Sequence, residues 1–383
     1  MRYCVVGGGF SGAIVARHLA EKGRQVLLID ERAHPGGNCH TERDASTGVM
    51  VHRYGPHIFH TADRRAWDYV RRFGTFHPYI NRVKAVSQGK IYTLPISLLT
   101  INQFFGTTMG PAEARRFIAG KADRTITEPR NFEEQALSMI GPDLYRAFFY
   151  GYTRKQWGIE PAELPASILK RLPVRFSYDD NYFTHPWQGI PEAGYTAVIR
   201  NILSVPGLEI RLGARFEDIE EPFAHVFYTG PLDRFFGFRN GRLGYRTLDF
   251  ERFEGEGDYQ GTAVMNYCDE TTPWTRISEH RHFAPWENIT SGRTVCFKEF
   301  SRLSGRNDIP YYPIRLVDEK KMLGEYLSMA RATAGVSFLG RLGTYRYLDM
   351  DVTVSEALSA CDLINQTLES GQQLPAFFTD LTA

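Results

Sequence analysis

The sequence lacks any marked excess of charge and any long apolar run. Its 45 lysines and arginines are balanced by 44 aspartates and glutamates, for a net charge of +1 over 383 residues. A chain without a large net charge exerts no general attraction on nucleic acid or on an anionic membrane, so any anion site must be local. No stretch of about 18 consecutive apolar residues occurs, and the sequence therefore predicts no membrane-spanning helix.

Cysteine is also scarce. Cys4, Cys39, Cys268, Cys296 and Cys361 are odd in number and widely spaced, without a CxxC pair. This pattern predicts free thiols in a reducing compartment and argues against a disulfide framework or a zinc site. The N-terminus passes from a short apolar segment directly into glycines, without the longer apolar stretch of a signal peptide. We therefore expect a cytoplasmic protein that neither inserts into membranes nor binds nucleic acid.

The first 30 residues carry the pattern of a dinucleotide-binding unit. A short apolar strand precedes the motif Gly7-x-Gly9-x-x-Gly12, and a helix and a second apolar strand that ends in Asp30 follow it. The first glycine makes the turn, the second admits a pyrophosphate, and the third lets the helix pack on the strand. An acid at the position of Asp30 binds a ribose hydroxyl and disfavours a 2′-phosphate. The motif alone is compatible with both NAD and FAD.

Beyond this unit the pattern changes from helical to strand-like. Residues 82–93 predict a hairpin, and residues 97–149 predict three or four short helices interrupted by glycine and proline. Residues 176–300 predict mostly strands, and a terminal helix is expected over about 352–368. The proline-bearing segment 157–173 joins the helical part to the strand-rich part, and we expect it to be mobile.

Several long motifs then follow one another along the chain. They are Gly7-Gly8-Gly9-Phe10-Ser11-Gly12-Ala13, Gly36-Gly37-Asn38, YGPHIFHT over 54–61, GYTRKQWG over 151–158, RLPVR over 171–175, DDNYF over 179–183 and GRLGTYRYLDM over 340–350. In content and order these motifs resemble those of the bacterial UDP-galactopyranose mutases, and the resemblance extends from Met1 to about residue 365.

The resemblance implies an α/β fold with a discontinuous Rossmann-like FAD-binding domain, an inserted helical lobe and an antiparallel β-sheet domain. The FAD-binding domain would comprise residues 1–60, 190–235 and 330–383, the lobe 83–149, and the substrate-binding sheet domain 61–82, 150–189 and 236–329 with a mobile loop over 157–173. The family also suggests a homodimer.

The resemblance further implies an isomerase that interconverts UDP-galactopyranose and UDP-galactofuranose, for galactofuranose-containing glycans. In the family this reaction uses a covalent adduct of the sugar with N5 of reduced flavin, so no side-chain nucleophile is required. Three alternatives stay open. The chain could be a mutase for UDP-N-acetylgalactosamine or a dTDP-sugar, a flavin oxidoreductase of the amine-oxidase type, or a non-catalytic flavoprotein that binds nucleotide sugars.

The residues that match the family's substrate positions are arginines, aromatics and amides. Arg171 and Arg276 match two diphosphate-binding arginines, and guanidinium groups suit phosphate oxygens. Together with His60, which matches a histidine beside the isoalloxazine, they are the expected catalytic residues. The other expected substrate contacts are Asn81, Tyr152, Trp157, Tyr182, Arg246, Asn266, Tyr312 and Tyr347. Tyr311 could replace Tyr312 after a register slip of one residue.

The residues that match the family's FAD positions come from separate segments of the chain. They are Gly7, Gly9, Phe10, Ser11, Gly12, Asp30, Glu31, Gly37, Asn38, His57, His60, Arg341, Asp349 and Met350. A positive group at Arg341 would favour the anionic reduced flavin. Cys39-His40 and Trp274 stand where other residues are commoner in the family, which leaves the detailed shape of the sugar pocket open.

Overall fold

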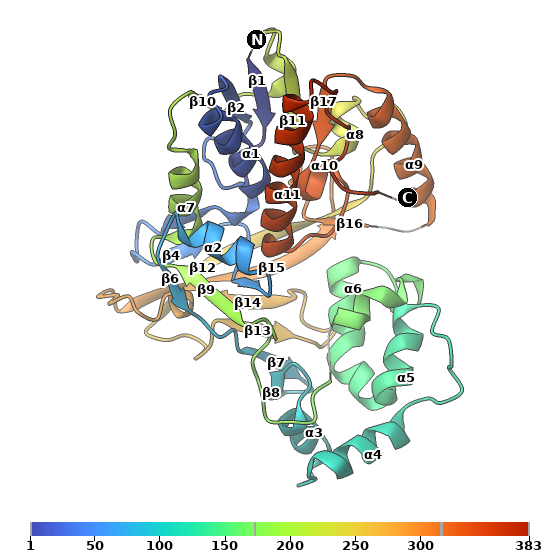
Figure 1. Cartoon of the computed structure of the whole chain (residues 1–383). Coiled ribbons are helices and arrows are strands. Elements are labelled where there is room, and N and C mark those ends of the chain that lie inside the picture. Colours follow the sequence, from blue (N-terminus) through green and yellow to red (C-terminus); the bar gives the residue numbers. More distant parts are fainter. Residues whose placement is uncertain (1, 172–173, 315–316, 382–383) are drawn as a thin grey trace.

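A parallel five-stranded sheet occupies one end of the molecule (Figure 1). The computed structural model describes residues 2–171, 174–314 and 317–381. The strands of this sheet are β1 (Tyr3–Val6), β2 (Val26–Asp30), β10 (Leu208–Leu212), β11 (His225–Tyr228) and β17 (Val336–Phe338). Their order is β10-β2-β1-β11-β17, and every neighbouring pair is parallel. Segments far apart in the sequence thus form one Rossmann-like sheet, which confirms the predicted fold class.

Helices cover both faces of the parallel sheet. They are α1 (Phe10–Glu21), α7 (Gly194–Leu203), α8 (Leu232–Phe235), α9 (Val317–Ala332), α10 (Gly340–Gly343) and α11 (Met350–Glu369). On one face α1 packs against α7 and α11 around buried side chains such as Ile14, Ile199 and Val354. On the other face Tyr326 and Leu327 of α9 belong to a second buried cluster with strand residues. Because both faces are covered, the inner strands β1, β2 and β11 are buried almost throughout, whereas the edge strand β10 carries the charged residues Glu209 and Arg211 and is partly exposed.

A seven-stranded sheet crosses the middle of the molecule (Figure 1). Its strands are β7 (Val83–Ser87), β8 (Lys90–Leu94), β12 (Tyr245–Glu256), β13 (Val264–Tyr267), β14 (Arg276–Glu279), β15 (Arg293–Leu303) and β16 (Tyr312–Pro313). The hairpin β7-β8 lies where the sequence predicts it. The sheet is antiparallel as predicted, except that β7 lies parallel to β13. The long chain between these two strands gives the connection the length that a parallel pair needs.

The helical lobe follows β8 and lies at the other end of the molecule (Figure 1). It contains α3 (Leu98–Phe105), α4 (Pro111–Lys121), α5 (Phe132–Leu144), a π-helical turn η2 (Tyr145–Tyr150) and α6 (Gly151–Trp157). Ser97 and Asn131 cap α3 and α5 by accepting backbone N–H groups, and Gly158 ends α6 in the left-handed conformation. Short helices in this part of the chain are therefore predicted correctly.

Smaller elements connect these units. They are β3 (Thr41–Arg43), β4 (Met50–His52), β5 (Phe59–Thr61), β6 (Phe76–Pro78), β9 (Trp187–Pro191), α2 (Arg64–Arg71), and the short turns η1 (Gly37–Cys39), η3 (Pro161–Glu163), η4 (Ala166–Arg171), η5 (Phe216–Asp218) and η6 (His280–Phe283). Strand β9 pairs with both β5 and β6. The predicted mobile segment contains η3 and η4, while residues 172–173 lie outside the described part.

All five cysteines are free, as their spacing predicts. Within the residues that the structure describes, no helix is long and apolar enough to cross a membrane. The exact domain boundaries given above remain a prediction.

Candidate active site

A cleft of about 960 Å³ lies between the parallel sheet and the seven-stranded sheet. Its walls come from the residues that follow β1, β2 and β11, from strands of the seven-stranded sheet, and from the start of α11. The carboxyl ends of parallel strands are the usual place for ligands in such folds. The cleft is therefore the natural candidate for the active site.

The glycine motif forms the tight turn between β1 and α1. Gly7 has a φ of +107°, and a Cβ built there would lie 2.0 Å from Thr229 Oγ1. A Cβ at Gly12 would lie 1.9 Å from the carbonyl oxygen of Gly7. Neither position accepts a side chain, so the backbone of the turn can approach a phosphate closely while the N-terminus of α1 faces the cleft.

Asp30 ends β2 and ties it to the glycine turn. Its carboxylate accepts hydrogen bonds from the backbone N–H of Gly8 (2.7 Å) and of Arg32 (2.8 Å). The Arg32 side chain donates to Asn38 Oδ1 (2.8 Å) and lies 4.5 Å over the ring of Tyr54. Sequence reasoning missed Arg32, although its position two residues after the acid of β2 is a usable signal.

Arg341, in the short helix α10 that follows β17, also lines the cleft. Its guanidinium lies 4.5 Å over the ring of Tyr347 and 5.1 Å over that of Tyr312, and these two rings stack at 5.7 Å. Its Nε and Nη2 are buried and have no hydrogen-bond partner among the described residues. A buried cation with unused donors fits a bound anionic group. Together with the glycine turn, this fits a dinucleotide cofactor such as FAD.

Arg276 begins β14 and lies within a polar cluster. Its Nε is 3.2 Å from Glu299 Oε1, and its Nη2 donates to the hydroxyl of Tyr152 at 2.8 Å. Burial lowers the pKa of Arg276, but the Glu299 carboxylate and the neighbouring tyrosines outweigh burial and raise it well above its usual value. Burial also raises the pKa of the Tyr152 and Tyr312 hydroxyls, which consequently stay protonated and can donate. Glu299 is a second residue that sequence reasoning missed.

Two histidines of the cleft are held neutral by burial. Burial lowers the pKa of His57 to about 4, and its Nδ1 lies 2.7 Å from the carbonyl of Gly55. Burial also lowers the pKa of His60, on β5, whose ring stacks on Phe183 at 3.6 Å and whose Nδ1 lies 2.9 Å from His185 Nδ1. These side chains can therefore offer or accept one hydrogen bond without carrying charge.

Most of the expected substrate residues meet in this cleft. Those that line it are Asn81, Tyr152, Tyr182, Asn266, Arg276, Tyr312 and Tyr347. Trp157 instead packs in the apolar cluster of the lobe. Arg246 lies outside the lining residues and donates to the carbonyl of Gln156 and to Ser301 Oγ, each at 3.1 Å. The side chain of Arg171, the last residue of η4, is outside the described part.

The neighbouring residues Tyr311 and Tyr312 have different surroundings. Both tyrosines line the cleft, but Tyr312 stacks on Tyr347 and lies beside Arg341, whereas Tyr311 is buried with its ring next to Phe250. This arrangement favours Tyr312 as the ligand contact.

Of the expected cofactor residues only Gly12 does not line the cleft, because it packs beneath the turn as the third glycine must.

Lys155 connects α6 to the chain segment that precedes Arg276. Its Nζ donates at 2.7, 2.9, 2.9 and 3.1 Å to the backbone carbonyls of Tyr267, Asp269, Thr272 and Trp274. One ammonium group therefore closes the loop between β13 and β14 onto the lobe.

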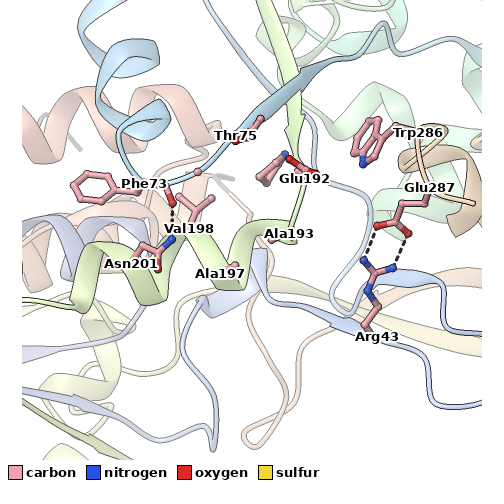
Figure 2. Close-up of a pocket in the computed structure, with 13 residues that line it drawn as sticks. Arg43, Phe73, Thr75, Glu192, Ala193, Ala197, Val198, Asn201, Trp286 and Glu287 are labelled. Atoms are coloured by element: carbon pink, nitrogen blue, oxygen red, sulfur yellow. Dashed lines mark hydrogen bonds and ion pairs between the residues drawn. The ribbon is translucent and has the colours of Figure 1, made fainter.

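A second pocket of about 460 Å³ lies at α7, away from the cleft (Figure 2). Figure 2 shows Arg43 and Glu287 facing each other at its edge, with both Nη atoms 2.5 Å from carboxylate oxygens. Asn201 donates to the backbone carbonyl of Phe73 at 2.8 Å. We call this the outer pocket.

Comparisons with known proteins agree with the site geometry. A family model of UDP-galactopyranose mutase matches residues 147–347, and a model of the NAD(P)-binding Rossmann-like domain matches residues 5–73. The chain is 56% identical to a probable UDP-galactopyranose mutase of Klebsiella pneumoniae, over 97% of each chain. It is 52% identical to a dTDP-fucopyranose mutase of Escherichia coli, over 94% of this chain and 97% of that one.

A solved structure described as reduced UDP-galactopyranose mutase superposes with a TM-score of 0.74 at 15% identity, covering 95% of both chains. That structural likeness supports the fold, while the sequence identities and the family model carry the assignment. The chain belongs to the UDP-galactopyranose mutase family.

Proposed function

We propose that this protein interconverts UDP-galactopyranose and UDP-galactofuranose, with FAD in its reduced form as cofactor. The observation that carries this proposal is the meeting of two anion-binding surfaces in one cleft. The glycine turn with Arg32 faces it from the parallel sheet, and Arg276 of β14 with Tyr152 of α6 faces it from the seven-stranded sheet and the lobe. One surface suits the pyrophosphate of a dinucleotide, and the other suits the diphosphate of a nucleotide sugar.

In this proposal the chain's own residues bind, orient and exclude water. Arg276, with Arg171 from η4, holds the diphosphate, and the hydroxyls of Tyr312 and Tyr347 donate to it. Glu299 fixes the direction of the Arg276 guanidinium through their contact at 3.2 Å. Arg341 supplies positive charge on the flavin side. Reduced flavin, when bound, would supply the nucleophile for the anomeric carbon, so that the sugar ring can reopen and reclose without net oxidation.

A dTDP-sugar mutase is the second candidate, because the chain is nearly as similar to a dTDP-fucopyranose mutase as to a UDP-galactopyranose mutase. A thymidine nucleotide adds a methyl group on the base and lacks the ribose 2′-hydroxyl, and fucose lacks the 6-hydroxyl of galactose. Discrimination therefore depends on the base and sugar subsites and not on the diphosphate cluster.

The test compares oxidised and dithionite-reduced enzyme with UDP-galactofuranose and with dTDP-fucofuranose. The product ring size is measured by NMR. We expect conversion of UDP-galactofuranose only after reduction, with no electrons consumed per turnover. Faster conversion of the dTDP-sugar would assign the second candidate. Continuous consumption of an electron acceptor, or formation of peroxide, would instead indicate an oxidoreductase.

We also propose a cytoplasmic homodimer whose product is used for cell-wall or lipopolysaccharide glycans. Light scattering after gel filtration tests the dimer. We propose in addition that segment 157–173 closes over the bound nucleotide and brings Arg171 to the diphosphate. Hydrogen exchange in this segment should slow when UDP binds, and unchanged exchange at saturating UDP would count against closure.

A further inference from the structure

His60 has an imidazole neighbour that the proposed function does not use. Strand β5 pairs with β9 so that His60 lies opposite Gln188. The side chain of Gln188 donates to the backbone carbonyl of His185 at 2.8 Å, which fixes the turn just before β9. This turn brings His185 Nδ1 to 2.9 Å from His60 Nδ1.

The ring of His60 is also fixed in its plane. It stacks on Phe183 with ring centroids 3.6 Å apart and an interplanar angle of 19°. With the ring plane set by the stack and Nδ1 engaged by His185, Nε2 is the ring nitrogen left for the cleft that His60 lines. Whether Nε2 is a donor or an acceptor there depends on the tautomer.

A contact between two Nδ1 atoms at 2.9 Å can hold one proton only. If both nitrogens carried hydrogen, two N–H groups would face each other, and if neither did, two lone pairs would. One imidazole must therefore donate and the other accept. When His60 accepts at Nδ1, its own hydrogen is on Nε2. When His60 donates, its Nε2 is a bare acceptor.

The charged groups around His60 decide between these arrangements. Burial is the main cause that lowers the pKa of His60, and although Asp349 and Asp351 at the start of α11 raise it, the net shift is downward and keeps His60 neutral. Asp349 lines the same cleft as His60, and a carboxylate only accepts, which favours a hydrogen on the cleft-side Nε2 of His60 over a bare lone pair. His185 is then the donor and His60 the acceptor at the shared contact.

We propose that His185 is a positioning residue that donates its Nδ1–H to His60 and thereby holds His60 as the neutral Nε2–H tautomer, with an N–H donor available to the cleft. The catalytic meaning of this inference rests on the proposed function. A fixed neutral donor can hydrogen-bond an electron-rich atom of the cofactor or the sugar without adding a second charge beside Arg341.

The test uses two substitutions of nearly equal size, His185→Asp and His185→Asn. A carboxylate only accepts, so His185→Asp forces His60 to place its hydrogen on Nδ1 and inverts the cleft-side nitrogen to an acceptor. An amide can still donate, so His185→Asn should keep the Nε2–H tautomer. Ring-¹⁵N histidine NMR of the full chain, with and without FAD, measures the tautomer directly, and His60→Ala assigns the signal.

We expect wild type and His185→Asn to show His60 as Nε2–H, and His185→Asp to show it as Nδ1–H. The Asp variant should retain FAD but lose about 10- to 100-fold in kcat, as partners of a functional histidine commonly do. The Asn variant should stay close to wild type in kcat. A wild-type His60 with its hydrogen on Nδ1, or the same tautomer in both variants, overturns the inference.

The outcome separates this inference from the proposed function. Tautomers that change as expected in a protein without mutase activity would support the positioning role and contradict the function. Mutase activity in a protein whose His60 tautomer does not respond to residue 185 would contradict only the positioning role.

Discussion

The cleft and the outer pocket each contain an arginine, yet the two arginines differ in how their donors are used. In the cleft, Nε and Nη2 of Arg341 are buried and lack a hydrogen-bond partner in the part of the chain that the structure describes. In the outer pocket, Arg43 places both Nη atoms 2.5 Å from Glu287. A buried unsatisfied donor costs about 1–3 kcal/mol, which folding tolerates where a ligand later satisfies it. The outer pocket also has a buried donor without a partner among the described residues, Trp286 Nε1, but it is uncharged. The difference between the two cavities is therefore the unused charged donor of the cleft, which suits an anion.

The largest expected effect is at Arg276. Arg276→Ala removes one partner of a desolvated ion pair with the diphosphate, at a cost of about 2–5 kcal/mol. This corresponds to a loss of roughly 30- to 5,000-fold in kcat/KM. Steady-state kinetics with UDP-galactofuranose measures this loss, and the flavin absorbance should stay that of the wild type. Near-normal turnover and UDP affinity would contradict the role of Arg276.

A smaller loss is expected at Arg341. Arg341→Ala removes one charged hydrogen-bonding group that would reach an anionic cofactor, worth about 1.5–3 kcal/mol, so FAD should bind roughly 10- to 100-fold more weakly. Titration of the FAD-free protein with FAD, followed by fluorescence, measures the affinity. Arg341→Lys is the control, because it keeps the charge but not the guanidinium geometry. Its FAD affinity should lie between that of the wild type and that of Arg341→Ala. Equal FAD affinity in all three proteins would remove Arg341 from the cofactor site.

The ion pairs of His282 with Asp258 and Glu279 should make the stability of the protein depend on pH. Its Nε2 lies 2.9 Å from Asp258 Oδ1 and 3.5 Å from Glu279 Oε2, and the hydrogen bond with Glu279 is the main cause that raises its pKa above 6.5. A raised pKa means that the protonated form is stabilised by folding. The contribution of His282 to the free energy of unfolding is therefore complete below pH about 6.5 and disappears as the pH rises through the raised pKa.

The corresponding experiment compares melting temperatures of wild type and His282→Gln from pH 5 to pH 9. The variant should melt several degrees lower at pH 5 to 6, and the two curves should converge toward pH 9. A difference that grows with pH would show that His282 is not protonated in this cluster.

The smallest effect is expected at Arg43. The side chain of Arg43 is 49% exposed, and ion pairs at such sites contribute about 0–1 kcal/mol. Arg43→Ala should change the free energy of unfolding by less than about 1 kcal/mol. It should leave kcat/KM within about twofold of the wild type, which makes it the matched control for Arg276→Ala. A large loss of activity in Arg43→Ala would break the distinction between the two cavities.

The features predicted correctly from sequence are those with local signals. The glycine turn, the acid of β2, the β7-β8 hairpin and the lobe helices each depend on residues within about one element of each other. That Asp30 binds a ribose stays a prediction, while the structure shows that its carboxylate accepts the backbone N–H of Gly8 and so closes the turn.

The features that sequence reasoning missed depend on long-range pairing. Glu299 meets Arg276 because β14 and β15 pair in that register, and His185 meets His60 across 125 residues of chain. The parallel pairing of β7 with β13 likewise follows from how the sheet assembles. Side-chain type alone carries no information about such partners, since an isolated glutamate or histidine is most often a surface residue.

The ammonium of Lys155 has a mechanical consequence. Because Lys155 donates to four carbonyls of one loop, α6 and the segment that leads into β14 should move together, since their separation would break several part-buried hydrogen bonds at once. A displacement of Arg276 on nucleotide binding would therefore be passed to α6, the lobe helix that carries Lys155. By linkage, the factor by which a fixed lobe orientation changes nucleotide affinity equals the factor by which the bound nucleotide changes the equilibrium between lobe orientations.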